Sequence, residues 1–338
     1  MNNDSLRLFE TESDYDSAKP DFVYPTVSYV RDIDEVKYMA KPIIPIHALP
    51  IKAVFYDSST GSFVKLYPDQ ITEVNPNYTP IGVEVIPAEH DVYGTGQAGI
   101  MSLAEMNYAT PDVGSSEYQY MYWGGYGTDT SLPNLDTVSL VDGTTANSGY
   151  LPSDKFTGTT SLDGVSKYYS TSNNAPSPYN ADGSRNEAYY TTAYSTANTL
   201  SDFDGVGNTA VLTELATGQS DWKTASTITH SYNKGYYPAA CCAWRFHTAG
   251  TDQGQWYLPA CGEFGYVVNR ISAINSTIIK VLSVYSSVVA VALPTSGNYW
   301  SSSEYSANYA RALYAYYGAV ASSGKDSDYY SVRAFLRV

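Results

Sequence analysis

The fold is decided by two stretches near the end of the chain, Asn298-Tyr-Trp-Ser-Ser-Ser-Glu-Tyr305 and Ser331-Val-Arg-Ala-Phe-Leu-Arg-Val338. The second stretch alternates aliphatic residues with arginine and phenylalanine, so successive side chains fall on opposite faces of an extended chain. This end of the chain is therefore predicted to be rich in β-structure. The residues predicted to form its core are Leu313, Val320, Val332, Ala334 and Leu336.

Between these stretches lies a window, residues 305–331, that is rich in tyrosine, serine, alanine and aspartate. The whole chain has 34 tyrosines beside nine phenylalanines and five tryptophans, an imbalance that favours recognition over core building. Tyrosine offers a rigid, amphipathic contact surface with only two side-chain torsions to immobilise, and small polar neighbours adapt to a partner. The window therefore predicts a binding surface. The alternative is a tyrosine-rich antiparallel sheet with solvated edges.

Upstream, the sequence predicts short strands and short helices. Ile51–Pro68 predicts a β-hairpin, because two β-rich runs flank a turn sequence, and Ile81–Ile86 predicts a further strand that ends before Pro87. Ser102 and Glu105 have capping-box spacing, which predicts a short helix. Helical character is also expected over residues 212–224 and 258–274.

Long loops are expected in the middle of the chain. Residues 114–201 are rich in Gly, Ser, Thr, Asn and Asp, but they contain more aromatic residues than disordered segments do. We therefore expect ordered loops anchored by tyrosines and Trp123. Together these patterns predict an α+β protein. A small β-rich N-terminal attachment region would occupy residues 1–75 and a ligand-binding domain residues 76–338.

Charge and composition exclude several classes of partner. The 338 residues carry a formal net charge of −15. Without a Lys/Arg stripe, neither nucleic acid nor an anionic membrane surface is an expected partner. The longest apolar region, Ile271–Leu293, is interrupted by polar residues, whereas a membrane-spanning helix needs about 20 apolar ones. The acidic N-terminus lacks the apolar core of a Sec signal, which predicts synthesis in a cytoplasm.

Two motifs are candidates for cofactor or metal binding. Gly94–Gly99 matches Gly-x-Gly-x-x-Gly, but no apolar strand precedes it, so a turn is expected rather than a dinucleotide site. Asp202, Asp204 and Asn208 offer oxygen ligands in a tight turn and are weak candidates for a structural calcium site. An Asp-Gly turn explains the same residues. No other cofactor is expected.

The remaining reactive side chains form no recognised catalytic pattern. The four histidines are scattered, and three cysteines are too few for a disulfide scaffold. Cys241 and Cys242 lie in an apolar stretch and are expected to be buried structural thiols. A convergent acid, base and nucleophile are missing from the sequence pattern, so we expect no enzymatic activity.

Three segments resemble, in the same order, the signatures of a known domain family: Trp256–Phe264, Asn298–Tyr305 and Ser331–Val338. They are similar to C-type-lectin-type domains related to formylglycine-generating enzymes. The similarity is strongest to the variable proteins of diversity-generating retroelements from gut Bacteroidales and their phages. Upstream, Met121–Asp129 and Tyr237–Thr248 also look like this group. The resemblance covers roughly residues 80–338.

The resemblance implies a variable region at about 298–331. In this family, adenine misreading converts AAY codons into NNY codons, which never encode Trp, Met, Lys, Glu or Gln. The window 305–331 contains only Lys325 from these five types. The implied framework is Trp256, Trp300, Glu304 and Arg333, with Trp300 packed and Glu304 hydrogen-bonded within the fold. The implied ligand-binding positions are Tyr305, Ala307, Asn308, Tyr309, Ala312, Tyr314, Tyr316, Tyr317, Ala319, Ala321, Ser322, Ser323, Asp326, Ser327, Asp328, Tyr329 and Tyr330.

The resemblance also implies a function. It predicts a C-type-lectin-type fold with long ordered loops in a non-catalytic, hypervariable receptor-binding protein at a phage tail tip. Its partners would be a protein or glycan receptor on a bacterial surface, other tail proteins and, in one arrangement, two further copies in a homotrimer. A bacterial cell-surface adhesin of a chromosomal retroelement is the alternative. A formylglycine-generating enzyme is disfavoured, because that group uses a cysteine pair near the C-terminal part of the domain and here the last cysteine is Cys261.

Overall fold

The computed structural model describes residues 6–9, 27–32, 35–40, 51–88, 95–130, 132, 202–268, 270–294, 296–315 and 319–338. At residues 6–40, 268 and 319–321 the description is limited to the backbone. The loops expected over 133–201 and the positions Tyr316 and Tyr317 lie outside the described residues. The chain divides into two compact units, Met1–Pro50 and Ile51–Val338.

The first unit contains a three-stranded sheet. Strand β1 (Leu6–Phe9) pairs in parallel with β2 (Val27–Asp32), and β2 pairs antiparallel with β3 (Glu35–Ala40). The boundary between the units falls after Pro50, whereas the sequence placed it after residue 75. The reason is that the hairpin beginning at Ile51 pairs with a strand of the second unit.

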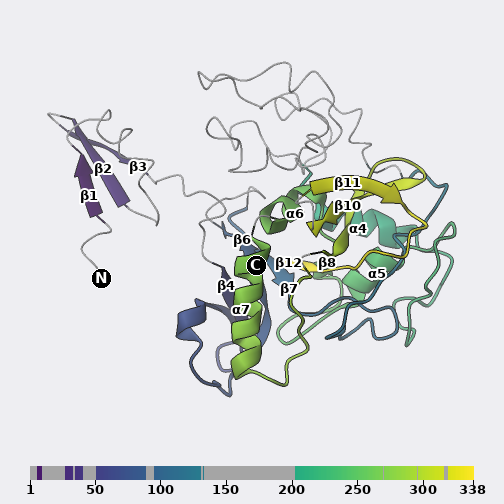
Figure 1. Ribbon diagram of the computed structural model, residues 1–338, viewed down its shortest axis with the longest axis horizontal. Coiled ribbons are helices and arrows are strands. Elements are labelled where there is room, and N and C mark those ends of the chain that lie inside the picture. Colours follow the sequence, from purple (N-terminus) through teal and green to yellow (C-terminus); the bar gives the residue numbers. More distant parts are fainter. Residues whose placement is uncertain are drawn as a thin grey trace. The chain divides into compact units, whose positions relative to one another are not determined.

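The second unit contains a six-stranded sheet with the order β5-β4-β6-β7-β12-β8, and Figure 1 labels β4, β6, β7, β12 and β8. The predicted hairpin is confirmed as β4 (Lys52–Asp57) and β5 (Ser62–Leu66). Residues of the turn itself stabilise it, because the Asp57 carboxylate accepts the Ser59 N–H at 2.9 Å and Gly61 adopts a positive φ of 70°. The 3₁₀ helix η4 (Pro68–Gln70) follows.

The middle of this sheet is built from segments far apart in the sequence. Strand β6 (Tyr78–Ile86) pairs with β4 and with β7 (Gly99–Ser102). The last strand, β12 (Phe335–Arg337), lies between β7 and β8 (Trp256–Tyr257). The C-terminal segment is therefore an interior strand, paired on both sides.

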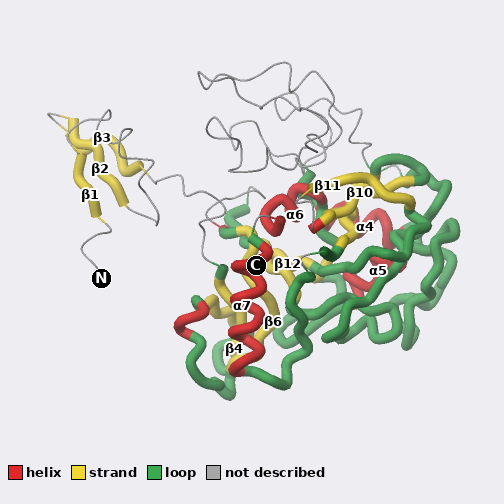
Figure 2. Tube along the Cα trace, in the orientation of Figure 1, coloured by secondary structure: helices red, strands yellow, loops and turns green. Residues whose placement is uncertain are grey.

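Four α-helices are described in this unit: α4 (Gly205–Glu214), α5 (Pro238–Arg245), α6 (Cys261–Val268) and α7 (Ile271–Val284). Helix α7 lies against β4 and β6 (Figure 2). The helix predicted over 258–274 is two helices bent by 74° relative to each other. The helix predicted over 212–224 begins earlier, because Asp204 caps α4 by accepting the Gly207 N–H at 3.1 Å, and it ends at Glu214.

The apolar stretch 271–293 does not form one long helix. In the described residues no single helix is long and apolar enough to cross a membrane, and α6 with α7 meets that test only as a bent pair.

A second, three-stranded sheet has the order β11-β10-β9 and is antiparallel throughout. Its strands are β9 (Asn298–Glu304), β10 (Tyr309–Tyr314) and β11 (Ala319–Gly324). Ser331 runs beside β9, because the Trp300 N–H donates to its carbonyl oxygen at 3.0 Å. The two stretches that decide the fold are thus neighbours, and the predicted α+β class is confirmed.

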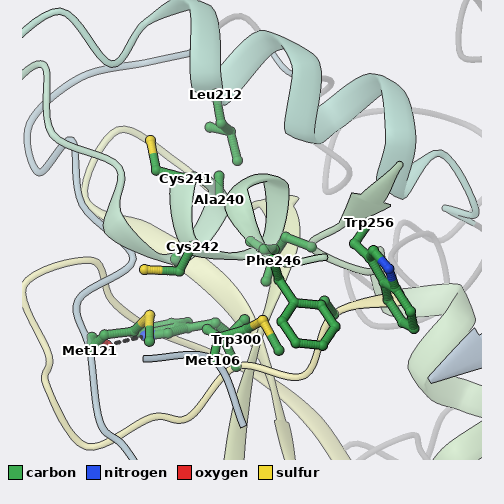
Figure 3. Packing of buried hydrophobic residues seen from close by; sticks show 14 of the residues in the cluster. Met106, Met121, Leu212, Ala240, Cys241, Cys242, Phe246, Trp256 and Trp300 are labelled. Atoms are coloured by element: carbon green, nitrogen blue, oxygen red, sulfur yellow. Dashed lines mark hydrogen bonds between the residues drawn. The ribbon is translucent and has the colours of Figure 1, made fainter. Parts of the chain in front are cut away.

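The core between these elements is closely packed (Figure 3). Trp300 is fully buried beside Met106 and Cys242, and its indole N–H donates to the Met121 carbonyl oxygen at 2.8 Å. Phe246 and Trp256 contact edge to face, with ring centroids 5.1 Å apart. Long loops, shown in green in Figure 2, cover much of this core.

A buried ion pair joins the C-terminal segment to the loop after β7. Arg333 Nε lies 2.9 Å from Glu105 Oε1, and both side chains are fully buried. The guanidinium also donates to the carbonyl oxygens of Ser102 and Leu103, and to that of Val291. Burial raises the pKa of Glu105, and Arg333 opposes that rise. The short helix predicted from Ser102 and Glu105 is wrong, because Glu105 serves this tertiary pair and forms a β-bridge with Ser115.

Replacing Arg333 with methionine should lower the free energy of unfolding by about 3–5 kcal/mol, because it leaves the Glu105 carboxylate buried without its partner. Chemical denaturation measures this change. The control Lys280→Met, at a partly exposed position of α7, should stay within about 0.5 kcal/mol of the original. The double variant Arg333→Met/Glu105→Met should be more stable than Arg333→Met alone. A loss below about 1 kcal/mol for Arg333→Met would contradict the assigned importance of the pair.

Candidate functional site

The predicted window begins with the β9–β10 hairpin. Its turn is closed by main-chain bonds, in which the N–H groups of Tyr305 and Ser306 donate to the Tyr309 carbonyl oxygen, both at 3.0 Å. The Tyr305 ring is covered by the Arg311 guanidinium 4.3 Å from its centroid and contacts the Tyr309 ring edge to face. Asn308 and Tyr309 are exposed at the tip.

A buried polar cluster supports this hairpin. Glu304, at the end of β9, accepts a hydrogen bond from Thr130 Oγ1 at 2.7 Å and forms an ion pair with Lys325. Lys325 also donates to the Thr128 carbonyl oxygen at 2.8 Å and lies 4.7 Å from the Trp123 ring centroid. Burial raises the pKa of Glu304 and lowers that of Lys325, and their pairing opposes both shifts.

The segment 121–130 is held along the hairpin by its backbone. Gly124 and Gly125 have φ values of 98° and 63°, and a Cβ on Gly124 would lie 2.0 Å from the Tyr236 carbonyl oxygen. Only glycine fits this close approach. The Gly124 N–H then donates to the Lys325 carbonyl oxygen at 3.2 Å, and the Gly127 N–H to that of Ala307 at 3.0 Å.

This arrangement gathers tyrosines from three separate parts of the chain. The Tyr126 N–H donates to the Tyr232 carbonyl oxygen at 2.9 Å, and the Tyr232 ring contacts those of Tyr122 and Tyr126 at 5.2 and 6.4 Å. The loop that carries Asp326, Asp328 and Tyr329 runs beside Tyr122, because the Gly124 N–H donates to the Lys325 carbonyl oxygen and the Met121 N–H donates to the Tyr330 carbonyl oxygen at 2.9 Å. We call this surface the tyrosine face; its residues are Tyr122, Tyr126, Tyr232, Asn308, Tyr309, Asp326, Asp328 and Tyr329.

Most predicted ligand-binding positions with described side chains lie at the surface. Tyr309 and Tyr329 are the most open tyrosines among them, with 47% and 71% of their surface exposed. The exposed or partly exposed positions are Tyr305, Ala307, Asn308, Tyr309, Tyr314, Ser322, Ser323, Asp326, Ser327, Asp328 and Tyr329. Tyr316 and Tyr317, and the side chains of Ala319 and Ala321, lie outside the described residues.

Two predicted positions do not reach the surface. Ala312 is fully buried in the middle of β10. Tyr330 is buried with its ring centroid 4.2 Å from that of Trp300, and its hydroxyl bonds to that of Tyr314. Their residue types match a variable surface, but the register of β10 turns Ala312 inward and packing against Trp300 buries Tyr330. They belong to the supporting core.

The predicted framework residues are all buried. Trp300 and Glu304 hold the contacts described above, and Arg333 forms the pair with Glu105. Trp256 donates from its indole N–H to Thr251 Oγ1 at 3.0 Å. Whether the surface positions around this framework vary in sequence stays a prediction.

The weak calcium candidates have structural roles. Asp202 is buried and accepts hydrogen bonds from Ser303 Oγ at 2.7 Å and Asn208 Nδ2 at 2.9 Å, while Asp204 caps α4. Both carboxylates therefore already accept hydrogen bonds from protein donors. Among the described residues no group of three or more His, Cys, Asp or Glu side chains is arranged to hold a metal ion.

All three thiols are buried and none is in a disulfide. Burial raises the pKa of Cys261 to about 12 and also raises those of Cys241 and Cys242. A thiol that is protonated and shielded from solvent is a poor nucleophile.

Three tyrosines of the face were missed by sequence reasoning. Tyr122, Tyr126 and Tyr232 lie outside the window, and Tyr122 and Tyr126 were expected only as loop anchors. The signal that could have found them is the Gly124-Gly125 pair, since adjacent glycines predict a tight backbone approach to another segment.

Comparisons with known proteins give no family assignment. No family model matches the chain, and no curated protein matches it. Among solved structures, a fimbrial protein from Bacteroides ovatus is similar, with a TM-score of 0.39 and 15% identity. The match covers 85% of this chain and 48% of that protein, so the chain spans about half of the fimbrial protein's length.

His230 lies directly behind the tyrosine face. Its ring is stacked between those of Tyr108 and Tyr122, with both centroids 4.4 Å away. The Nε2 atom is buried and has no hydrogen-bond partner in the described part of the chain. Burial lowers the pKa of His230, and the nearby Asp328 carboxylate opposes this. The folded protein therefore favours the neutral imidazole.

As the pH falls below about 6.5, the unfolded chain should take up a proton that folded His230 resists, so stability should fall. His230→Phe keeps a stacked ring but cannot titrate. Its melting temperature should therefore decline less than that of the original protein between about pH 7.5 and 5.5. Thermal unfolding across this range measures the difference. Parallel declines would show that His230 is not the source.

Proposed function

We propose that this chain is a non-catalytic, hypervariable ligand-binding protein that contacts its partner through the tyrosine face. The observation that carries the proposal is the face itself, in which exposed tyrosines from three segments are held by main-chain bonds over a buried framework. Tyr309 and Tyr329 are large and exposed, yet they sit on a hairpin tip and a loop anchored by the Glu304–Lys325 pair. Rigid aromatic anchors among small polar residues are typical of binding surfaces.

We further propose that the chain is a variable protein of a diversity-generating retroelement with a C-type-lectin-type fold. The distribution of residue types supports this. Trp300, Glu304 and Lys325, which AAY mutagenesis cannot produce, are all buried. The exposed positions of the face, such as Asn308, Asp326 and Tyr329, are all types that it can produce. Diversification without unfolding requires this division, with residue types that AAY mutagenesis cannot produce in the buried framework and types that it can produce at the surface.

The proposed place of action is a phage tail tip, where the chain would bind a receptor on a bacterial surface. A bacterial cell-surface adhesin carrying the same face is the other setting, and the genes beside the coding sequence distinguish the two. An enzyme of the formylglycine-generating type is not proposed, because all three cysteines are buried thiols with raised pKa values.

The double variant Tyr309→Ala/Tyr329→Ala should weaken binding by at least about tenfold, because it removes the two most exposed aromatic anchors. Probes are selected on the full chain from a displayed library of random linear peptides and from a glycan array, and affinities are measured by interferometry. The matched control is Tyr67→Ala, an exposed tyrosine at the end of β5, outside the face. Equal affinities for the double variant, or a large fall in its melting temperature, would remove the binding assignment.

The coding DNA provides a separate test. Sequencing the neighbouring DNA should reveal a reverse transcriptase gene and a near-identical repeat rich in AAC and AAT. Adenine substitutions should fall at the codons of Asn308, Tyr309, Asp326, Asp328 and Tyr329, and should spare Ala312 and Tyr330, which the fold buries. A repeat that diversifies Ala312 and Tyr330 as freely as the exposed codons would contradict the division between framework and surface. If no such repeat exists, the retroelement assignment fails.

A further inference from the structure

The tyrosine face carries an excess of negative charge. Asp326 and Asp328 belong to it, and exposed Asp129 lies beside it on the segment that follows Tyr126. Nearby cations are engaged within the fold: Lys325 is buried against Glu304, and Arg311 covers the Tyr305 ring.

One exposed cation, Lys234, lies near the edge of the face. Its Cε would be 3.6 Å from a Cβ built on Gly127. In the described residues of this region, Asp326 and Asp328 thus lie beside one exposed lysine.

The negative groups lie close to the aromatic rings. Main-chain bonds from Gly124 to Lys325 and from Met121 to Tyr330, at 3.2 and 2.9 Å, hold the loop that carries Asp326 and Asp328 alongside the segment that carries Tyr122 and Tyr126. The faces of aromatic rings also carry partial negative charge, so rings and carboxylates attract the same kind of group. A cation entering between them gains from both.

We infer that the tyrosine face binds a protein segment that presents arginine or lysine side chains, with their cationic groups over the tyrosine rings and against Asp326 and Asp328. This inference rests on the proposed function and names its partner class. A guanidinium suits the site well, because it stacks on aromatic rings while its N–H groups pair with carboxylates. A neutral glycan would gain nothing from the net negative charge, and an anionic one would be repelled.

Long-range electrostatics act in the same direction. The chain as a whole has a formal charge of −15, so a basic partner is attracted before contact. Such steering raises the association rate and weakens as salt screens the charges. Association with a basic segment should therefore depend strongly on ionic strength.

The test uses the displayed library of random linear peptides, panned on the full chain and on Asp326→Asn/Asp328→Asn. Peptides enriched on the original chain should contain more Arg and Lys than the input library and more than those enriched on the variant. For one such peptide, the variant should weaken affinity about 3- to 20-fold. The control Asp69→Asn/Glu73→Gln makes the same charge change at exposed positions outside the face. It should change the affinity by less than about twofold, because distant, solvent-screened charges contribute little to binding.

Salt provides a second readout. Raising the ionic strength from about 0.05 to 0.5 M should slow association of the peptide several-fold with the original chain and less with Asp326→Asn/Asp328→Asn, which lacks the two carboxylates nearest the bound peptide but keeps the rest of the negative charge. Equal salt dependence for the two proteins would overturn the inference, as would enriched peptides with no excess of Arg and Lys.

The remaining outcomes separate the inference from the function on which it rests. Peptides that bind without a basic excess but are lost on Tyr309→Ala/Tyr329→Ala would overturn the inference and leave the face as a binding site. Glycans bound in place of peptides, and lost on the same tyrosine variant, would do likewise. Basic peptides that bind equally well after the tyrosine substitutions would overturn both. A library that yields no binder also counts against a basic peptide partner.

Discussion

The structure depends first on the buried guanidinium of Arg333. It meets Glu105 and the carbonyl oxygens of Ser102, Leu103 and Val291, so one side chain joins the end of β7, the loop after it, the loop before β9 and the C-terminal segment. A buried charge tolerates few arrangements, because each unpaired polar group is strongly destabilising. The position of the last strand, between β7 and β8, follows from this constraint, and so does the course of the chain beside β9.

The tyrosine face depends in turn on a second buried pair. Glu304 ends β9 and Lys325 directly follows β11, so both lie at the same end of the three-stranded sheet, and together they bind Thr128 and Thr130 from the loop that passes beside them. Two indole N–H groups reinforce the contact, Trp123 donating to Ser301 and Trp300 to Met121. The surface residues are therefore supported from beneath as well as by the ring contacts among them. This division allows exposed side chains to serve recognition without carrying the fold.

Local patterns made the hairpin Ile51–Pro68 and the α+β class predictable, since a turn and its two strands are neighbours in sequence. Long-range pairing decided the rest. The sequence predicts that Glu105 caps a helix, but it forms an ion pair with Arg333, which lies more than two hundred residues later in the chain. Tyr330 matched the composition of a binding surface, and only the register beside Trp300 shows that it is buried. Tyr232 joins the face through a main-chain bond to Tyr126, and side-chain patterns do not encode such a bond.

The hydrogen bonds that hold the turns of the face together join mostly main-chain atoms, and this makes the surface tolerant of sequence change. Gly127 bonds to the carbonyl oxygen of Ala307, and Lys325 to that of Asn308, whatever side chains those two positions carry. Natural selection can thus sample new side chains there without redesigning the scaffold. Proline is the exception at Tyr305, Ser306 and Tyr309, because each of these residues donates its main-chain N–H to a carbonyl oxygen of the same turn. The turn therefore accepts many side chains at its tip but excludes proline where the N–H groups close it.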